Sequence, residues 1–207
     1  MILYKFYKFD YGVQALLSDK IKLTTLEEIN DPYELKGVKI GKGGIADLYK
    51  PHELFSDTLF ACFSRDYSSP IMCSHYADIH KGMVVGYEYI GNKKVIEVKY
   101  RNAMRKFPKK PVNLGEYLAE IKFKKWDYEK ESRILFSTKD IQPSYNNQDF
   151  YYFIKNNEYG FAVKEVIYGF NSDLIKIKKL HDLLDKRIAQ FKSELNDDKF
   201  VVDRYLF

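Results

Sequence analysis

Short apolar and aromatic stretches, each about as long as a β-strand, recur along the chain and constrain its fold more than any other feature. Glycine, proline, asparagine or charged residues separate them, which is the pattern of strands joined by turns. Gly91-Asn92 predicts a hairpin between two of these strands. The predicted strands are residues 2–8, 21–24, 58–64, 83–89, 93–100, the second half of 126–136, 150–154, 161–170 and 200–207.

Helical patterns are fewer and mostly short. Ser69-Pro70 predicts the start of a helix that ends at Gly82, because serine caps helices and proline suits the first helical position. Capping boxes at residues 25–28 and 113–116 predict two more short helices, the second running to about Lys122. The longest predicted helix follows apolar residues at spacings of three and four: Leu174, Ile177, Leu180, Leu184, Ile188, Phe191 and Leu195.

This arrangement predicts a single α+β domain over residues 1–207, with a mixed, mostly antiparallel sheet and flanking helices. An aromatic content of 16% excludes a disordered chain, and the longest apolar runs are too short for a membrane-spanning helix. Met1–Lys5 has the pattern of a strand rather than of a signal peptide. Cys62 and Cys73 fit neither a metal-ligand spacing nor a disulfide framework, so a cytoplasmic location is expected. The oligomeric state is left open.

Positive charge is concentrated between Lys93 and Lys125. This segment holds eleven Lys and Arg residues against three Glu, a local excess larger than the +5 of the whole chain. Such a segment attracts phosphate, so nucleic acid or a nucleotide is a candidate partner. We expect Arg101–Lys110 to form a mobile loop whose charges lack partners. The alternative is an ordinary solvated face.

Met72–Gly82 carries an unusual density of titratable groups. At helical spacing His75 shares one face with Ile71, and Tyr76 lies on a neighbouring face. His75, Tyr76 and Lys81 are therefore candidate site residues. The alternative is a half-buried helix whose polar groups satisfy one another.

A second candidate group is Glu129, Glu131 and Arg133. In a strand these side chains point to one face, and two close carboxylates disfavour shared ionisation unless a cation lies between them. Paired carboxylates suit general-base catalysis or the binding of a ribose; the alternative is a surface ion pair beside Trp126.

Glu97-Val-Lys99 supports a rival hypothesis, a metal-dependent nuclease in which Glu88 or Asp78 supplies a further acid. The chain has no phosphate-binding loop and no Gly-x-Ser-x-Gly elbow, and the spacing of His75 and His80 is poor for zinc. No resident metal site is predicted.

Four motifs in order resemble those of the bacterial domain of unknown function 2971 family. They are Asn30-Asp-Pro-Tyr-Glu34, Cys62-Phe-Ser64, Ser74-His-Tyr-Ala-Asp-Ile-His-Lys-Gly82 and Trp126-Asp-Tyr-Glu-Lys-Glu-Ser-Arg133. The resemblance covers most of residues 3–170 and implies a common site but no established activity. It draws the motif residues Asn30 and Asp31 into the predicted pocket, although we expect Asn30-Asp31-Pro32 to act first as a backbone turn.

A more distant likeness is to ADP-ribosyltransferases, which implies NAD as the cofactor or substrate. By order along the chain, the likeness makes Lys5 the anchor on the first strand, Ser64 the strand serine, and Glu131 the catalytic acid with Glu129 before it. The resulting hypothesis is a transferase of ADP-ribosyl type acting on a macromolecule, in phage defence or as a toxin. The alternatives are the nuclease and a non-catalytic nucleic-acid or nucleotide sensor.

The hypothesis carries two further expectations. His75 and Glu131 should face one cavity, with Arg133 or Lys81 between them. Glu131→Gln should abolish activity with little loss of stability, because glutamine keeps the shape of the side chain and removes its charge.

Overall fold

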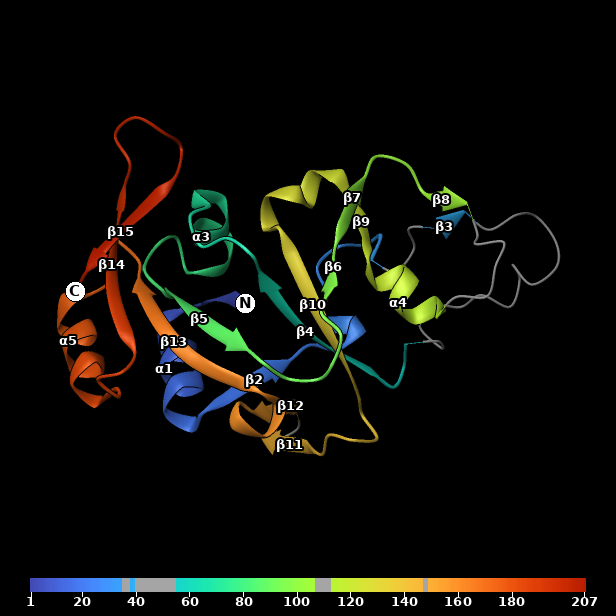
Figure 1. The fold of residues 1–207 in the computed structure, drawn as a ribbon, viewed down its shortest axis with the longest axis horizontal. Helices are drawn as coiled ribbons and strands as arrows, with labels where there is room; N and C mark the ends of the chain where they lie inside the picture. The colour runs from blue at the N-terminus through green and yellow to red at the C-terminus, as the bar shows by residue number, and fades with distance from the viewer. Residues whose placement is uncertain (35–37, 40–54, 107–112, 147–148) are drawn as a thin grey trace.

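An eight-stranded sheet forms the centre of the fold (Figure 1). The computed structural model describes residues 1–34, 38–39, 55–106, 113–146 and 149–207. In the order β15-β14-β13-β5-β1-β4-β10-β6, the strands of the sheet are Val202–Leu206, Ala189–Leu195, Phe161–Tyr168, Met83–Tyr89, Ile2–Tyr7, Thr58–Ser64, Glu131–Ser137 and Ile96–Glu97. Only the β13–β14 pair of this sheet is parallel. The predicted α+β domain with a mixed, mostly antiparallel sheet is confirmed.

Smaller sheets and short helices surround this sheet. The small sheets comprise β11 (Pro143–Asn146), β12 (Asp149–Lys155) and β2 (Lys20–Leu23); β3 (Val38–Lys39) with β8 (Arg105–Lys106); and β7 (Lys99–Arg101) with β9 (Ile121–Phe123). The α-helices are α1 (Phe9–Ser18), α3 (Pro70–Tyr76), α4 (Leu114–Ala119) and α5 (Leu174–Leu183). The 3₁₀ helices are η1 (Leu26–Glu28), η3 (Lys124–Glu129) and η4 (Asn157–Tyr159). None of the helices in these ranges is long and apolar enough to cross a membrane.

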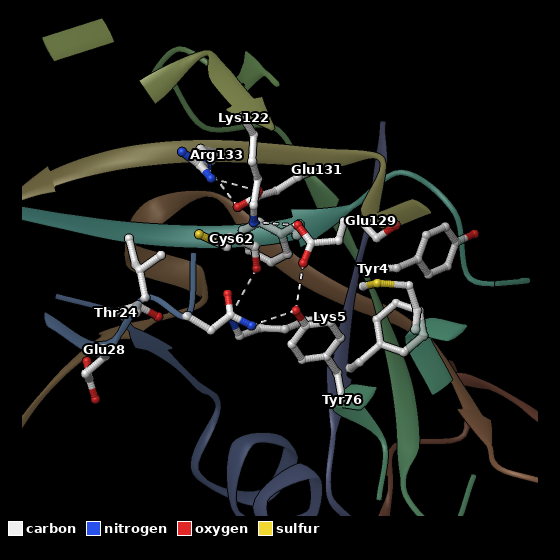
Figure 2. Close-up of a pocket in the computed structure, with 16 residues that line it drawn as sticks. Tyr4, Lys5, Thr24, Glu28, Cys62, Tyr76, Lys122, Glu129, Glu131 and Arg133 are labelled. Carbon is white, nitrogen blue, oxygen red and sulfur yellow. Dashed lines mark hydrogen bonds and ion pairs between the residues drawn. The ribbon is translucent and has the colours of Figure 1, made fainter. Parts of the chain in front are cut away.

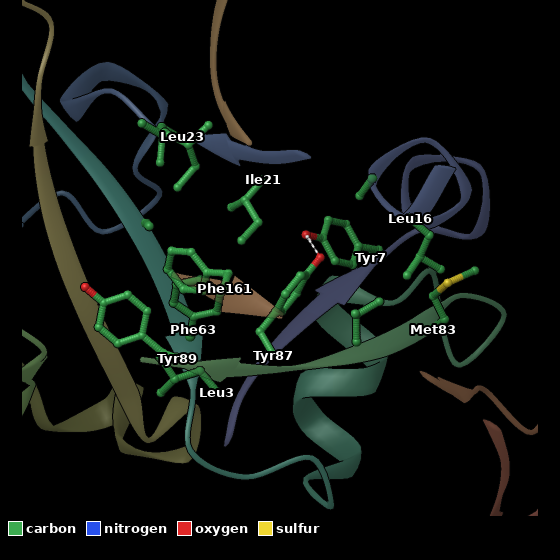
Figure 3. Packing of buried hydrophobic residues seen from close by; sticks show 14 of the residues in the cluster. Leu3, Tyr7, Leu16, Ile21, Leu23, Phe63, Met83, Tyr87, Tyr89 and Phe161 are labelled. Carbon is green, nitrogen blue, oxygen red and sulfur yellow. Dashed lines mark hydrogen bonds between the residues drawn. The ribbon is translucent and has the colours of Figure 1, made fainter. Parts of the chain in front are cut away.

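The main hydrophobic core lies against one face of the central strands (Figure 3). Leu3 and Tyr7 lie four positions apart, on the same face of β1, and both side chains point into this core. Residues of α1 and α5 pack in the same core. The hydroxyl oxygens of Tyr7 and Tyr87 lie 3.0 Å apart, so the two buried phenols satisfy one another. This packing holds β1 firmly to β5.

β1 follows β5 and departs from β4. It pairs with β5 at every position from Ile2 to Tyr7 but meets β4 only at Tyr4 opposite Ser64. Strands that diverge leave unpaired backbone groups and open space between their side chains. The central sheet therefore opens beside the end of β4.

The predicted Ser69–Gly82 helix is shorter than expected. The Ser69 hydroxyl accepts the Met72 N–H at 3.3 Å, as predicted for the cap, but the helix ends at Tyr76. Residues 78–80 follow with φ values of 50°, 52° and 63°, which a right-handed helix cannot contain. Local side-chain preference predicted the start of the helix, whereas the turn back into β5 sets its end.

The predicted helix over residues 174–195 is also wrong in its second half. Asp173 caps α5, but α5 ends at Leu183 and residues 189–195 form β14. β14 pairs with β13 and β15, and these hydrogen bonds between distant residues outweigh a spacing that also fits a helix.

The predicted hairpin at residues 91–92 and the predicted strand at residues 93–100 are wrong as well. β5 does not form a hairpin across Gly91-Asn92, because it pairs with β1 and β13. The strand predicted at residues 93–100 is split into β6 and β7, which belong to different sheets. Part of the predicted basic loop consists of β7 and β8. Residues 102–104 connect these two strands, and residues 107–110 lie outside the described residues. Residues 37–57, whose glycines, charges and poor periodicity predict a loop, also lie mostly outside them.

Gly82→Ala should destabilise the fold by about 1–3 kcal/mol, because the new Cβ would lie 2.0 Å from the Tyr7 carbonyl oxygen. Gly115→Ala is the control, since its Cβ comes no closer than 3.3 Å to any neighbour, the Asn113 Oδ1, and should change stability by less than about 0.5 kcal/mol. Urea denaturation measures both variants. Equal stabilities would mean that the backbone around Gly82 yields easily.

Candidate functional site

A cavity of about 270 Å³ opens where β1 departs from β4 (Figure 2). In this view β1 runs across the direction of β4 and β10, and side chains from all three strands reach the cavity. The side chains around the cavity are Tyr4, Lys5, Phe6, Thr24, Glu28, Ile29, Asn30, Cys62, Phe63, Ser64, Met72, Tyr76, Lys122, Glu129, Glu131 and Arg133.

Arg133 is the most deeply buried charged side chain of the site, with no exposed surface. It donates to both carboxylate oxygens of Glu34 at 2.6 and 2.9 Å, and to both of Glu131 at 2.8 Å. A further bond, 3.1 Å long, goes to the Ala119 carbonyl. Every N–H of the guanidinium thus has an acceptor. A buried cation needs this degree of satisfaction to remain charged.

Lys122 extends the same network from β9. Its Nζ lies 2.6 Å from Glu129 Oε2, 3.2 Å from Glu131 Oε2 and 3.9 Å from Glu34 Oε2. We call the five residues Glu34, Lys122, Glu129, Glu131 and Arg133 the ion cluster. All five are buried.

Lys5 adds a further cation at the edge of the cavity. Its Nζ donates to the Cys62 carbonyl at 3.1 Å and lies 5.4 Å from the centre of the Phe63 ring. The pKa of Lys5 is lowered chiefly by burial. Among the described residues, the cavity lining contains three basic side chains, Lys5, Lys122 and Arg133, and three acidic ones, Glu28, Glu129 and Glu131, so it carries no large excess of either sign.

Tyr76 connects α3 to the ion cluster. Its hydroxyl donates to Glu129 Oε1 at 2.7 Å and accepts from Asn30 Nδ2 at 3.0 Å. Burial, and then the negative charge of Glu129, raise the pKa of Tyr76. Asn30, Tyr76 and Glu129 therefore form a chain of hydrogen bonds along the wall of the cavity.

The two carboxyl groups on either side of Lys130 have opposite pKa shifts. Burial, reinforced by the charge of Glu131, raises the pKa of Glu129 although Lys122 opposes the shift. Burial also acts to raise the pKa of Glu131, but the charges of Arg133 and then Lys122 outweigh burial and lower this pKa to about 2. Two neighbouring carboxyl groups with separated pKa values suit different roles, Glu129 as an acid or base and Glu131 as a permanent anion.

Seven predicted site residues come together around the cavity: Lys5, Asn30, Ser64, Tyr76, Glu129, Glu131 and Arg133. The Ser64 hydroxyl is engaged in the turn after β4, since it donates to the Asp66 carbonyl at 2.8 Å and accepts the Asp66 N–H at 3.0 Å. Ser64 therefore lines the cavity and also stabilises the turn after β4.

The prediction that His75 and Glu131 face one cavity is wrong. His75 is exposed, does not line the cavity, and has its Nδ1 3.3 Å from the Tyr128 hydroxyl. Its neighbour on that helix face, Ile71, is 47% exposed, whereas Met72 and Tyr76 point to the cavity. Helical spacing grouped the residues correctly but did not indicate which face is buried.

Asp31 and Lys81 also lie outside the cavity lining. Asp31 is buried, and its Oδ1 accepts the Tyr33 N–H at 2.9 Å, which confirms that Asn30-Asp31-Pro32 forms a backbone turn. Lys81 is exposed, so it is not the cation that was expected between His75 and Glu131. The second cation beside Glu131, in addition to Arg133, is Lys122.

Lys122 and Glu34 are the site residues that the sequence analysis missed. Lys122 was placed at the end of a helix, but α4 ends at Ala119 and Lys122 lies in β9. The alternation of Ile121, Lys122 and Phe123 is a weak strand signal that would have placed it correctly. Glu34 belongs to the quoted Asn30–Glu34 motif, and no local pattern connects it to Arg133.

Glu97 and Lys99 of the nuclease hypothesis line one shallow cavity, but neither Glu88 nor Asp78, its further acids, lines it with them. Glu97 is on β6 and Lys99 on β7, strands of different sheets, and Lys99 pairs with Glu120 at 2.8 Å. Glu88 pairs with Lys164 at 2.9 Å, and Asp78 is exposed in the turn after α3. Within residues 1–34, 38–39, 55–106, 113–146 and 149–207, no group of three or more acidic, histidine or cysteine side chains is placed to hold a metal ion.

Some charges between Lys93 and Lys125 have partners, and one of them, Arg105, belongs to the Arg101–Lys110 segment in which none was expected. Lys94 pairs with Glu116, and Arg105 pairs with Glu120 at 2.6 Å while it lies over the Tyr117 ring. Arg101 forms no ion pair with any residue that the structure describes. Phosphate attraction is thus to be sought at particular side chains rather than along the whole segment.

Arg133→Met should destabilise the protein by about 3–5 kcal/mol, because it keeps the side-chain volume but leaves Glu34 and Glu131 buried without their main partner. Arg187→Met is the control, since Arg187 pairs with Asp185 on the surface. It should leave the transition unchanged. Chemical denaturation of both variants measures the difference, and a stable Arg133→Met protein would contradict this account of the ion cluster.

Acid should remove the contribution of Glu131 to stability. A carboxyl whose pKa is lower in the folded state stabilises the fold above its unfolded pKa, and that contribution is lost as the pH falls through the folded pKa. For Glu131 the loss should extend from about pH 4.5 to about pH 2. We therefore expect Glu131→Gln to be less stable than the unsubstituted protein at pH 7, which revises the expectation from sequence. The difference should shrink across that window in urea titrations at stepped pH; a constant difference would contradict the assignment.

Comparisons with protein-family models, with curated proteins and with solved structures find no match. The function is therefore inferred from the cavity and the residues around it.

Proposed function

We propose that this protein is an ADP-ribosyltransferase-like enzyme that binds the nicotinamide-ribose end of NAD in the cavity and transfers ADP-ribose to a macromolecule. A role in phage defence or as a toxin is part of the same proposal. The observation that carries it is the alignment of three adjacent strands, in which Ser64 of β4 lies opposite both Tyr4 of β1 and Glu131 of β10.

This alignment brings together residues that the likeness to ADP-ribosyltransferases had assigned by their order along the chain. Lys5, the proposed anchor, follows Tyr4 on β1 and lines the same cavity as Ser64 and Glu131. The three residues lie on strands that are far apart in the sequence. Their convergence supports a common site, and Glu129 joins it from the end of η3.

The size of the cavity agrees with part of a dinucleotide. Pockets that enclose a whole small-molecule ligand measure about 300–1,000 Å³, and this one measures about 270 Å³. It would hold the nicotinamide ring and its ribose, with the diphosphate and adenosine outside. The nicotinamide ring of NAD is cationic, and Glu129 and Glu131 offer carboxylates on the same wall.

In the proposed reaction the bond between ribose C1′ and the nicotinamide nitrogen breaks, and its electron pair leaves with nicotinamide. A nucleophilic oxygen or nitrogen of the acceptor forms a new bond to C1′, and Glu129 takes the acceptor proton. A carboxyl group with a raised pKa suits this general-base step. Glu131 stays ionised and stabilises the positive charge that develops on the ribose. Tyr76 orients Glu129 through their 2.7 Å hydrogen bond.

The test is release of nicotinamide from NAD, with and without a candidate acceptor such as total cellular RNA, DNA or protein. Glu129→Gln should lower the rate by about 10²–10⁴-fold, as expected for loss of a general base. Glu158→Gln is the control, because Glu158 forms an exposed ion pair with Lys155. Circular dichroism should show that both variants are folded.

A second pair of variants tests the positioning of Glu129. Tyr76→Phe removes the hydroxyl that contacts Glu129, whereas Tyr128→Phe removes one that contacts His75 outside the cavity. We expect Tyr76→Phe to shift the pH–rate profile and Tyr128→Phe to leave it unchanged. Binding of NAD without release of nicotinamide would favour a nucleotide sensor instead, and absence of both binding and release would reject the proposal.

A further inference from the structure

A second cavity, of about 240 Å³, lies beside the β7–β9 strand pair. The residues around it are Tyr33, Arg101, Asn102, Ala103, Met104, Ile121, Lys122 and Phe123. Of the described residues that line the two cavities, only Lys122 is common to both. The two cavities therefore have separate linings that meet at one side chain.

The register of β7 and β9 explains how the strand pair serves both cavities. Tyr100 lies opposite Lys122, and both reach the ion cluster: the Tyr100 hydroxyl accepts the Glu131 N–H at 2.7 Å, and the Lys122 Nζ contacts Glu129. The next residues, Arg101 and Phe123, also lie opposite one another. Since strand side chains alternate between faces, Arg101 and Phe123 point away from the ion cluster.

The walls of this second cavity are apolar and open to solvent. Tyr33 is 59% exposed, Met104 44% and Phe123 41%. Single exposed apolar side chains are ordinary, but several around one cavity mark a binding surface. Two of the three are aromatic, and aromatic rings bind flat ligands by stacking on their faces.

The charges around the cavity select the sign of the ligand. Arg101 and Lys122 are cationic, and no carboxylate lines the cavity among the residues that the structure describes. Lys122 is committed to the ion cluster, whereas Arg101 has no ion-pair partner among residues 1–34, 38–39, 55–106, 113–146 and 149–207. A guanidinium without a carboxylate partner is well suited to a phosphate. The side chain of Asn102 offers both a donor and an acceptor to the edge of a ring.

We propose that this second cavity binds a nucleotide, with the base against Tyr33 and Phe123 and the phosphate on Arg101. A volume of about 240 Å³ is below the range of pockets that enclose a whole small-molecule ligand. The cavity would therefore hold the base, with the phosphate on the exposed Arg101. Two sources of the nucleotide share this chemistry: a free mononucleotide and one residue of a single-stranded nucleic acid. The inference does not depend on NAD chemistry in the first cavity.

The test is fluorescence-anisotropy binding of a labelled single-stranded oligonucleotide of about ten nucleotides, in low salt and without NAD. Arg101→Gln and Phe123→Ala should each weaken binding about tenfold, the size expected for loss of one stacking or phosphate contact. Phe123→Tyr should retain affinity, because it keeps the ring. Lys125→Gln is the matched control, since Lys125 is exposed in the same segment but does not line the cavity. It should weaken binding less than about twofold.

Competition with AMP separates the two sources. Displacement of the oligonucleotide by AMP, with a loss of AMP affinity in Arg101→Gln, would assign the cavity to a free nucleotide. Retention of the oligonucleotide in the presence of AMP would assign it to a nucleic-acid strand. The proposal is overturned if neither ligand binds, if the Arg101 and Phe123 variants bind as the unsubstituted protein does, or if Lys125→Gln loses as much affinity as Arg101→Gln. Because NAD is absent, these results are independent of the transferase test.

Discussion

The buried guanidinium of Arg133 connects parts of the chain that do not pair with one another as strands. From β10 it reaches Glu34, beyond η1, and the Ala119 carbonyl at the end of α4. Through Glu131 it also positions Lys122 of β9. A lysine could not replace it, because only a guanidinium supplies enough N–H groups in a fixed plane to meet all these acceptors. The cavity depends on this arrangement, since one of its walls is the ion cluster.

The same network gives two neighbouring carboxylates different chemistry. Glu131 lies between Arg133 and Lys122 and is held as an anion. Glu129 also contacts Lys122, and its other carboxylate oxygen accepts a hydrogen bond from Tyr76. Burial raises the pKa of Glu129, whereas at Glu131 the two cations Arg133 and Lys122 outweigh burial and lower the pKa. An enzyme that must both move a proton and stabilise positive charge needs such a separation.

Local sequence patterns predicted the α+β class, the strand at residues 58–64, and the cavity residues Tyr76, Glu129, Glu131 and Arg133. Lys5, Asn30 and Ser64 were added by the resemblances to known families. The local patterns succeeded because strand alternation, capping residues and short motifs act over a few residues. They failed where distant residues decide the outcome. The helix face that carries His75 is defined by spacing, but its exposure depends on what packs against α3. The apolar residues of 189–195 fit a helical spacing, but this segment forms a strand because β13 and β15 provide hydrogen-bond partners on both sides. Lys122 likewise acquires its role only from Glu129 and Glu131.

The position of β1 in the sheet has a consequence for how the protein folds. Although β1 comes first in the chain, it lies between β5 and β4, and β5 in turn pairs with β13, which ends at Tyr168. A contact between residues so far apart in the sequence costs loop-closure entropy before it contributes to stability, and this cost slows folding. During synthesis, the sheet around β1 can therefore be completed only after most of the chain has emerged. Both the cavity and the ion cluster can form only late, because β10 contributes to each of them.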